Sequence, residues 1–229
     1  MTLQVNDLDH RDATQVVGSY NKSGSGQPNL YRAFGKRMLD ILLVGMAAPF
    51  VVPLVLAMAA LVALDGHNPF YLQERVGRNG RVFRIFKLRT MVPNAKAMLE
   101  TYLARDGDAR AEWEETQKLR HDPRVTRIGQ ILRATSLDEL PQLLNVLKGD
   151  MSLIGPRPMM VEQTDLYPGS AYYKLRPGIS GSWQVSDRNG TTFAARATYD
   201  TEYYQSMSLW LDVKIMVLTV VVVLRGTGC

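Results

Sequence analysis

The chain has 229 residues and a mass of 25.7 kDa, a size that fits one domain or one domain with an appendage. Its 27 Lys and Arg residues against 22 Asp and Glu give a net charge of +5, and 46% of the residues are apolar. These averages exclude a polytopic membrane protein, a disordered acidic chain and a collagen-like fibre. The single cysteine, Cys229, excludes an intrachain disulfide and a Cys-rich zinc site.

The first 30 residues differ in composition from the rest of the chain. They carry three acids and two bases, together with a stretch rich in Gly, Ser, Asn and Gln that ends at Pro28. Such a composition buries too little apolar surface to fold, so residues 1–30 are predicted to form a disordered tail. The tail does not resemble a secretory signal, because no basic region precedes an early apolar core.

A long apolar segment follows the tail. From Ile41 to Leu64 the sequence has 24 residues without a charged or hydrogen-bonding side chain. At about 1.5 Å per helical residue this segment would be ~36 Å long, enough to cross the ~30 Å hydrocarbon core of a bilayer. A buried core helix is the alternative, but such helices seldom run this long without polar residues. The segment therefore indicates membrane contact.

Two features of this segment argue against a straight membrane span. Pro49 and Pro53 lie within it, and each proline removes a backbone donor and bends a helix. Cations, which tend to stay on the cytoplasmic side, flank both ends. They are Arg32, Lys36 and Arg37 before the segment, and Arg75, Arg78, Arg81, Arg84, Lys87 and Arg89 after it. Residues 31–64 are therefore predicted to form a re-entrant membrane helix hairpin.

The remaining residues, 65–229, are predicted to form the soluble domain. Phe83–Leu88 alternates aromatic and apolar residues with bases, which is typical of a strand, and Ala95–Leu103 has apolar residues at helical spacing. The acidic stretch at 112–115 is expected to be a solvated helix face without chemistry. A second apolar segment, Ile215–Leu224, is too short to span a bilayer, and its β-branched residues leave an interfacial helix and a buried strand open.

A pair of adjacent acids is the first candidate for chemistry. It lies in the segment Thr135–Pro141, where Pro141 is tolerated only in the first turn of a helix. Asp138 is then expected at the positive end of the helix dipole, which keeps a carboxylate ionised and attracts phosphate. The alternative is structural, because Ser136 and Glu139 also match a capping box.

A proline-flanked arginine is the second candidate. Arg157 lies between Pro156 and Pro158 in the segment Lys148–Pro158, so its backbone is stiff and its guanidinium suits a phosphate group. The segment lacks the Gly-Lys-Ser/Thr of a Walker loop, and a rigid surface turn remains the alternative. Other cations in this half of the chain are Arg124, Arg127, Arg133, Lys148, Arg176 and Arg188.

These residues suit an anionic, phosphorylated substrate presented at a membrane. Adjacent residues such as Asp138 and Glu139 point about 100° apart on a helix, so one is expected to attack while the other holds Mg²⁺ through oxygen. Two other classes stay open. One is a membrane-anchored binding protein with a basic face for anionic lipid. The other is a membrane-tethered nucleic-acid binder, although no nucleic-acid motif or pattern of stacking aromatic residues accompanies the cations.

At these residues the chain resembles the bacterial sugar transferases, the monotopic polyprenyl-phosphate phosphoglycosyl transferases. The resemblance covers Tyr31 to Leu224 in the order of the family's motifs, and it is greatest to the initiating transferases of succinoglycan-type exopolysaccharide. The matching segments are Lys36-Arg37-x-x-Asp40, the proline-containing apolar segment, Phe86–Met91, Asp122–Gly129, Thr135–Leu144, Lys148–Pro158, Arg176–Gly181 and Leu211-Asp212-x-Lys214.

The resemblance implies an activity and roles for the candidate residues. A hexose-1-phosphate, with galactose-1-phosphate as the first choice and glucose-1-phosphate as the second, would pass from a UDP-hexose to undecaprenyl phosphate with release of UMP. This would be the first membrane step in assembling an exopolysaccharide repeat unit. Asp138 would be the nucleophile that forms a covalent phospho-sugar intermediate, and Glu139 would hold Mg²⁺. The substrate-binding residues would be Arg133 and Arg157, which bind phosphate groups, together with Lys87, Arg89 and Arg188.

The resemblance also implies a location, partners and a fold. The catalytic domain would lie on the cytoplasmic face of the bacterial inner membrane, in contact with membrane lipid and serving downstream glycosyltransferases, with no nucleic-acid partner. Homo-oligomerisation is left open. The fold is expected to be mainly α with a small β component: an N-terminal re-entrant membrane helix hairpin plus a cytoplasmic α+β catalytic domain with interfacial helices. The chain looks like the minimal catalytic unit of the family.

Overall fold

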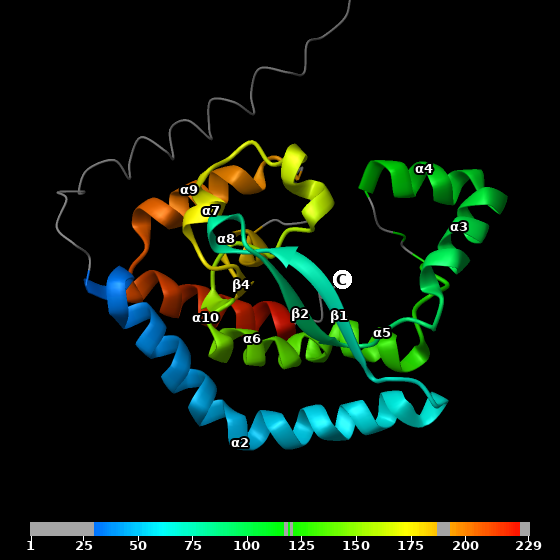
Figure 1. The fold of residues 1–229 in the computed structure, drawn as a ribbon, viewed down its shortest axis with the longest axis horizontal. Coiled ribbons are helices and arrows are strands. Elements are labelled where there is room, and N and C mark those ends of the chain that lie inside the picture. Colours follow the sequence, from blue (N-terminus) through cyan, green and yellow to red (C-terminus); the bar gives the residue numbers. More distant parts are fainter. Residues whose placement is uncertain (1–29, 117–118, 120, 187–192, 225–229) are drawn as a thin grey trace, which may run out of the picture.

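The computed structural model describes residues 30–116, 119, 121–186 and 193–224. Nearly all of the predicted tail over 1–30 lies outside these residues, and so does Arg188. The described chain is mainly helical with two small sheets (Figure 1), which confirms the predicted balance of helix and strand.

The elements follow one another in chain order. The helices are α2 (Lys36–Val62), α3 (Ala95–Arg105), α4 (Gly107–Thr116), α5 (Arg127–Ala134), α6 (Leu143–Lys148), α7 (Ala171–Lys174), α8 (Ser182–Val185), α9 (Arg196–Ser206) and α10 (Leu209–Leu224). The strands are β1 (Phe70–Val76), β2 (Val82–Leu88), β3 (Ser152–Ile154) and β4 (Gly178–Ser180). Short turns of 3-10 or π helix are η1 (Tyr31–Gly35), η2 (Ala63–Asp65), η3 (Arg78–Gly80), η4 (Leu137–Gln142) and η5 (Val161–Leu166).

The apolar segment forms one long helix, α2, which is bent near its middle (Figure 1). Pro49 and Pro53 lie inside the helix and explain the bend, because each removes a backbone hydrogen bond. The two halves meet at an open angle and the chain does not fold back into an antiparallel hairpin. Its return to one membrane face therefore stays a prediction.

Most of the surface of α2 is apolar and uncovered. By its length and composition the helix could cross a membrane. Only 6% of its most apolar 18-residue stretch is buried. Phe50, in the middle, is 79% exposed. A core helix of a soluble protein would be covered on most sides, so this exposure favours membrane contact over the buried-helix alternative.

A narrow stripe of α2 packs against the rest of the protein. In one core cluster Val44 joins Phe83, Ile85, Val146 and Met151, which come from β2, α6 and the residue before β3. In a second cluster, two residues near the end of α2 join residues of β2 and α5; the four are Ala59, Val62, Leu88 and Leu132. Both halves of the helix are thus part of the hydrophobic core.

The strand predicted at Phe83–Leu88 is β2, and it pairs with β1 in an antiparallel hairpin from Phe70 opposite Leu88 to Val76 opposite Val82. The sequence analysis did not predict β1. The second sheet is a short parallel pair, with Ser152 opposite Gly178 in β3 and β4. The β3 strand leads into the loop that carries Arg157, and its pairing with β4 holds that strand in place. This pairing therefore helps to position the candidate site.

Three helical predictions have clear outcomes. The helix expected at Ala95–Leu103 is α3, and the acidic stretch at 112–115 lies on α4, where Glu114 is exposed as expected of a solvated face. Ile215–Leu224 lies in α10, so the buried-strand alternative for that segment is wrong. The outer surface of α10 is apolar: Trp210 is 78% exposed and Val217 is 59% exposed.

Candidate functional site

The acid pair lies on η4, a short turn between α5 and α6. Ser136, just before the turn, adopts a left-handed conformation with φ of 56° and makes no capping hydrogen bond. The Glu139 carboxylate is bonded to Lys87 and does not reach back to cap the turn. The capping box considered from the sequence is therefore not formed, and both carboxylates are available for another role.

The two carboxylates face different surroundings. Asp138 is buried, with 8% of its surface exposed. The Oε1 atom of Glu139 lies 2.7 Å from the Nζ atom of Lys87 on β2, which packs against η4. In a 3-10 turn adjacent side chains diverge by about 120°, so the predicted divergence of the pair is present, although in this tighter form of helix.

The pKa values of the two acids move apart. Burial raises the pKa of Asp138 above its ordinary value, and the charge of Glu139 adds to this effect. Burial alone would also raise the pKa of Glu139, but the charges of Lys87 and Arg157 outweigh it and lower the pKa to about 2. Burial therefore has the largest effect on the pKa of Asp138, whereas neighbouring cations keep Glu139 ionised; that Asp138 is ionised stays a prediction.

Asn145 fixes the distance between the strand and the turn. Its side chain is fully buried, and its amide donates to the carbonyl of Arg84 at 2.8 Å while its oxygen accepts from the N–H of Phe86 at 3.1 Å. Both partners lie in β2 beside Lys87. Because α6 directly follows η4, this amide holds the strand that carries Lys87 against the acid pair.

Glycines bring the backbone of the Arg157 loop close to β4. The N–H of Gly155 donates to the carbonyl of Ser180, and the N–H of Gly178 donates to the carbonyl of Pro156, both at 2.8 Å. A Cβ atom on Gly178 would lie 2.1 Å from the nitrogen of Gly155. No residue with a Cβ atom fits there. The close contact between Gly155 and Gly178, which belong to two different motifs, therefore fixes the start of the loop that carries Arg157.

The charge of Arg157 acts on Glu139 and on a second group of cations. Its charge helps to lower the pKa of Glu139, which places the guanidinium within electrostatic reach of that carboxylate. Burial lowers the pKa values of Arg75 and Arg196, and together with the charge of Arg157 it brings both to about 10. Among the described residues, the Nε atoms of Arg75 and Arg196 are buried without a hydrogen-bond partner. This concentration of positive charge suits an anion.

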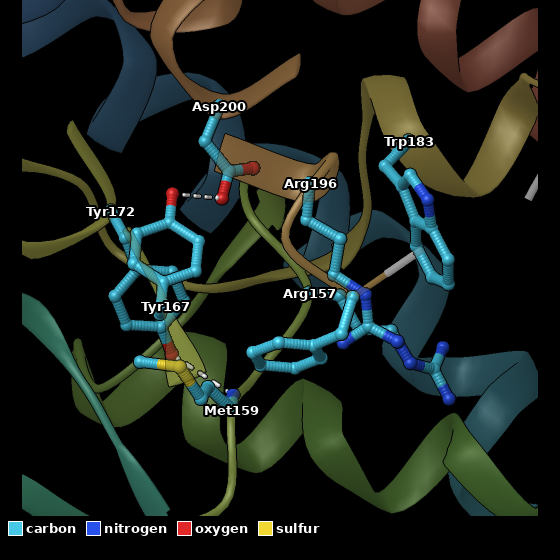
Figure 2. A pocket seen from close by; sticks show the side chains of 8 residues that line it. Arg157, Met159, Tyr167, Tyr172, Trp183, Arg196 and Asp200 are labelled. Carbon is cyan, nitrogen blue, oxygen red and sulfur yellow. Dashed lines mark hydrogen bonds between the residues drawn. The ribbon is translucent and has the colours of Figure 1, made fainter. Parts of the chain in front are cut away.

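An aromatic pocket opens beside Arg157 (Figure 2). Tyr167 donates to the carboxylate of Asp200 at 2.7 Å, and the guanidinium of Arg196 lies 4.1 Å from the ring centre of Trp183. The residues that line the pocket are Arg157, Met159, Tyr167, Tyr172, Trp183, Phe193, Arg196 and Asp200. The pocket therefore combines aromatic faces with two arginines and one carboxylate.

A family model described as bacterial sugar transferase matches residues 31–226, which include the acid pair, the Arg157 loop and α2. The chain belongs to the bacterial sugar transferase family. The resemblance seen in the sequence is thereby confirmed.

Named relatives of this sugar transferase support the same family. It is 45% identical over 197 residues to the UDP-galactose-lipid carrier transferase of Erwinia amylovora, which covers 85% of this chain and 41% of that protein. It is 43% identical over 196 residues to the exopolysaccharide production protein ExoY of Rhizobium meliloti, covering 84% and 87%. The UDP-glucose:undecaprenyl-phosphate glucose-1-phosphate transferase of Caulobacter vibrioides is 39% identical over 210 residues, covering 87% and 73%. The chain thus spans about two fifths of the Erwinia relative and most of the other two.

The structure brings together five of the predicted site residues of this sugar transferase and separates a sixth. Lys87 and Arg157 lie near the acid pair, and the charge of Arg133 lowers the pKa of Asp138 against the effect of burial. Arg89 instead lies at the end of α2, where it pairs with Asp65 at 2.7 Å and donates to backbone carbonyls. Its substrate-binding role stays a prediction, as does that of Arg188.

The other cations noted in the sequence serve separate contacts. Arg124 pairs with Asp122 at 2.6 Å and lies over the ring of Trp113. Arg176 donates to the carbonyl of Gly149 at 2.9 Å. Both cations are therefore engaged in contacts within the protein.

Sequence reasoning missed Arg75, Asn145, Arg196 and Asp200. An arginine in a strand and an arginine at the start of a helix look like any surface cation, and only the tertiary fold shows that their Nε atoms are buried. One signal was present for Asp200: it lies one turn after Arg196 on the same helix, at the spacing of an i, i+4 pair.

The residues around Glu139 fit Mg²⁺ in one way, with Glu139 as a single carboxylate ligand and substrate phosphates and water as the others. Within the described residues there is no group of three His, Cys, Asp or Glu side chains that could enclose a metal ion. Mg²⁺ in phosphoryl-transfer sites takes one or two carboxylates and completes its ligands with substrate phosphates and water. Glu139 is ionised and can supply one such carboxylate, although Lys87 occupies it here.

Proposed function

We propose that this sugar transferase moves a hexose-1-phosphate from a UDP-hexose to undecaprenyl phosphate and releases UMP. The observation that carries the proposal is the acid pair itself: a buried Asp138 beside an ionised Glu139, which is bonded to Lys87 and feels the charge of Arg157. The relatives' names support a lipid-linked sugar phosphate as the product. Such a product would be extended by glycosyltransferases during exopolysaccharide assembly.

The proposed reaction has two displacement steps at one phosphorus atom. A carboxylate oxygen of Asp138 attacks the β-phosphorus, which carries the sugar, and the phosphoanhydride bond breaks so that UMP leaves with the bridging oxygen. The aspartyl phospho-sugar is then attacked by a phosphate oxygen of undecaprenyl phosphate, and the Asp138 carboxylate leaves. A desolvated carboxylate is more basic than a solvated one, which suits the attacking role.

The surrounding residues have separate roles in this scheme. Lys87, Arg133 and Arg157 bind the phosphate groups and offset the charge that builds up on the transferring phosphoryl group. Glu139 would hold Mg²⁺, which when bound neutralises diphosphate charge and orients the leaving group. The phosphates would compete with Glu139 for Lys87 as the substrate enters.

The proposed site of action is the cytoplasmic face of the bacterial inner membrane. The uncovered apolar surface of α2 supports membrane contact, and exposed apolar residues on neighbouring helices extend it, among them Ile131 of α5, Leu144 of α6 and Trp210 of α10. The bend at Pro49 and Pro53 supports a re-entrant path, because it turns the second half of α2 away from the direction of the first. Both cationic flanks would then stay in the cytoplasm.

Galactose-1-phosphate is proposed as the sugar phosphate. The relatives from Erwinia amylovora and from Salmonella typhimurium carry galactose in their names, at 45% identity each. The relative from Caulobacter vibrioides is named for glucose, at 39% identity. A comparison of UDP-galactose with UDP-glucose as donors would decide between the two sugars.

The deciding experiment measures UMP release by the full chain in detergent or nanodiscs, with UDP-galactose, Mg²⁺ and undecaprenyl phosphate. We expect Asp138→Asn to abolish both UMP release and the covalent phospho-sugar adduct, because the carboxamide is not a nucleophile. Asp108→Asn, an exposed change on α4, serves as the matched control and should keep full activity. Full activity in Asp138→Asn would refute the mechanism. An inactive wild-type protein that still binds anionic vesicles would favour the membrane-anchored binding protein.

A further inference from the structure

The first turn of α2 carries charged residues that the proposed reaction does not use. In the sequence, Lys36 and Arg37 are positive charges that flank the membrane segment and are expected to stay on the cytoplasmic side. Asp40 is part of the same motif. In the structure all three are bonded to the catalytic domain. Asp40 is only 3% exposed. Residues that served only to orient the helix in the bilayer would face solvent or lipid headgroups.

Arg37 fastens α2 to the helix that follows the acid pair. Its guanidinium donates to the carbonyl oxygens of Val146 and Leu147, the latter at 2.9 Å. These carbonyls lie at the end of α6, where the partial negative charge of the helix carbonyls attracts a cation. Since α6 continues directly from η4, the position of Arg37 is coupled through one rigid unit to Asp138.

Asp40 fastens α2 to the strand that leads to Arg157. Its Oδ1 atom accepts a hydrogen bond from the N–H of Leu153 at 3.0 Å. Leu153 lies in β3, four residues before Arg157, and the intervening backbone is held by the glycine contacts with β4. The hydrogen bond accepted by this buried carboxylate therefore ties α2 to the other half of the site.

Asp212 secures the same end of α2 to the C-terminal helices. This carboxylate is 1% exposed and accepts hydrogen bonds from Lys36 at 2.7 Å, Tyr203 at 2.6 Å and Tyr31. Tyr203 lies on α9, which also carries Arg196 of the aromatic pocket. The start of α2 is thus bonded to α6, to β3 and, through Asp212, to the C-terminal helices α9 and α10.

We propose that Asp40 and Arg37 are positioning residues that set the distance between Asp138 and Arg157 from the first turn of the membrane helix. The proposal rests on the proposed function. Misplacing reacting groups by about 1 Å can lower a rate ~100-fold, so even a small shift of β3 relative to η4 should be visible in catalysis.

The test compares Asp40→Ala, which removes the acceptor, with Asp40→Asn, whose amide oxygen still accepts from Leu153. Pre-steady-state UMP release gives a burst amplitude that counts active sites and a rate constant for those sites. We expect Asp40→Ala to lower the rate constant about 10- to 100-fold with the KM for UDP-galactose within ~2-fold of wild type. Asp40→Asn should restore most of the rate, and Asp108→Ala is the control.

Each outcome decides the proposal. A purely structural role would lower the burst amplitude and leave the rate constant of the remaining sites unchanged, which overturns it. Equal losses in Asp40→Ala and Asp40→Asn also overturn it. If Asp40→Ala does not fold, the Arg37→Lys variant tests the proposal instead. Lysine keeps the charge but cannot donate to the carbonyls of Val146 and Leu147 together, so the rate constant should fall. A wild-type rate in Arg37→Lys would refute the coupling. No burst in the wild-type protein would instead be a failure of the proposed function.

Discussion

At the scale of single residues, the acid pair shows how two neighbours in sequence acquire different chemistry. Asp138 is buried and its pKa is raised, whereas Glu139 is surrounded by cations and its pKa is lowered to about 2. Because the pKa of Glu139 lies below its ordinary 4.5 in the folded protein, its ionisation stabilises the fold above about pH 4.5. That contribution is lost as the pH falls through about 2.

This linkage gives a prediction for the Lys87→Met variant. Removing the ammonium group that lies 2.7 Å from Glu139 should destabilise the protein by about 1.5–3 kcal/mol at pH 7, as for other hydrogen bonds to charged groups. The difference in Tm between wild type and variant should shrink below pH 4.5 and vanish near pH 2. Thermal unfolding in one detergent across this pH range measures it, and a difference that does not change with pH would contradict the assignment.

The sequence could identify the acid pair but not its environment. Asp138, Glu139 and Arg157 stand out because prolines and glycines fix their backbone, and that information is local. Burial depends on what packs against a residue, so neither the raised pKa of Asp138 nor the burial of Arg75 was predictable from a single chain. The dipole argument placed Asp138 at a helix start and had no information on its burial, which has the largest effect on its pKa.

At the scale of elements, the parallel pair β3–β4 depends on close backbone contact. Two glycine motifs meet there, and a Cβ atom on Gly178 would clash with backbone that cannot move aside. The sequence shows both motifs but not that they touch, because their contact joins segments more than 20 residues apart. Likewise β1 was missed, since its sequence does not alternate between apolar and polar residues: Phe70, Tyr71 and Leu72 are followed by three polar residues.

We expect Gly178→Ala to lower activity by more than about 10-fold and to lower Tm, because the loop that holds Arg157 must shift by more than the ~1 Å that already costs catalysis. Gly107→Ala is the matched control: nothing lies within 4 Å of its Cβ position, and alanine favours a helix. UMP release and thermal unfolding of both variants measure the effect. Wild-type activity in Gly178→Ala would show that the loop tolerates displacement.

At the scale of the whole molecule, the charge and the apolar surface are arranged around α2. Residues 31–94 hold nine cations against three acids, and these cations lie on both sides of the apolar segment. Composition located this segment correctly, but it could not give the shape of the bend or the stripe that packs on the domain. Those follow from contacts with β2, α5 and α6.

The re-entrant path predicts the same accessibility for both flanks. In a Cys229→Ser background, Ser25→Cys and Arg81→Cys should both react with a membrane-impermeant maleimide in inside-out vesicles, and neither should react in right-side-out vesicles. Arg105→Cys on α3 reports the side of the catalytic domain. Opposite accessibility of positions 25 and 81 would show that α2 spans the bilayer.

The shared core of α2 and the catalytic domain has a consequence for biosynthesis. Val44 packs against Val146, which lies about one hundred residues later in the chain. At translation rates of about 5–20 residues per second, the ribosome needs roughly 5–20 s to deliver the second half of this contact. During that interval the residues of α2 that will pack against the domain have no protein partner. The lipid bilayer is the apolar environment available to them. The helix must therefore first settle in the bilayer and then exchange part of its lipid contact for the domain that folds onto it.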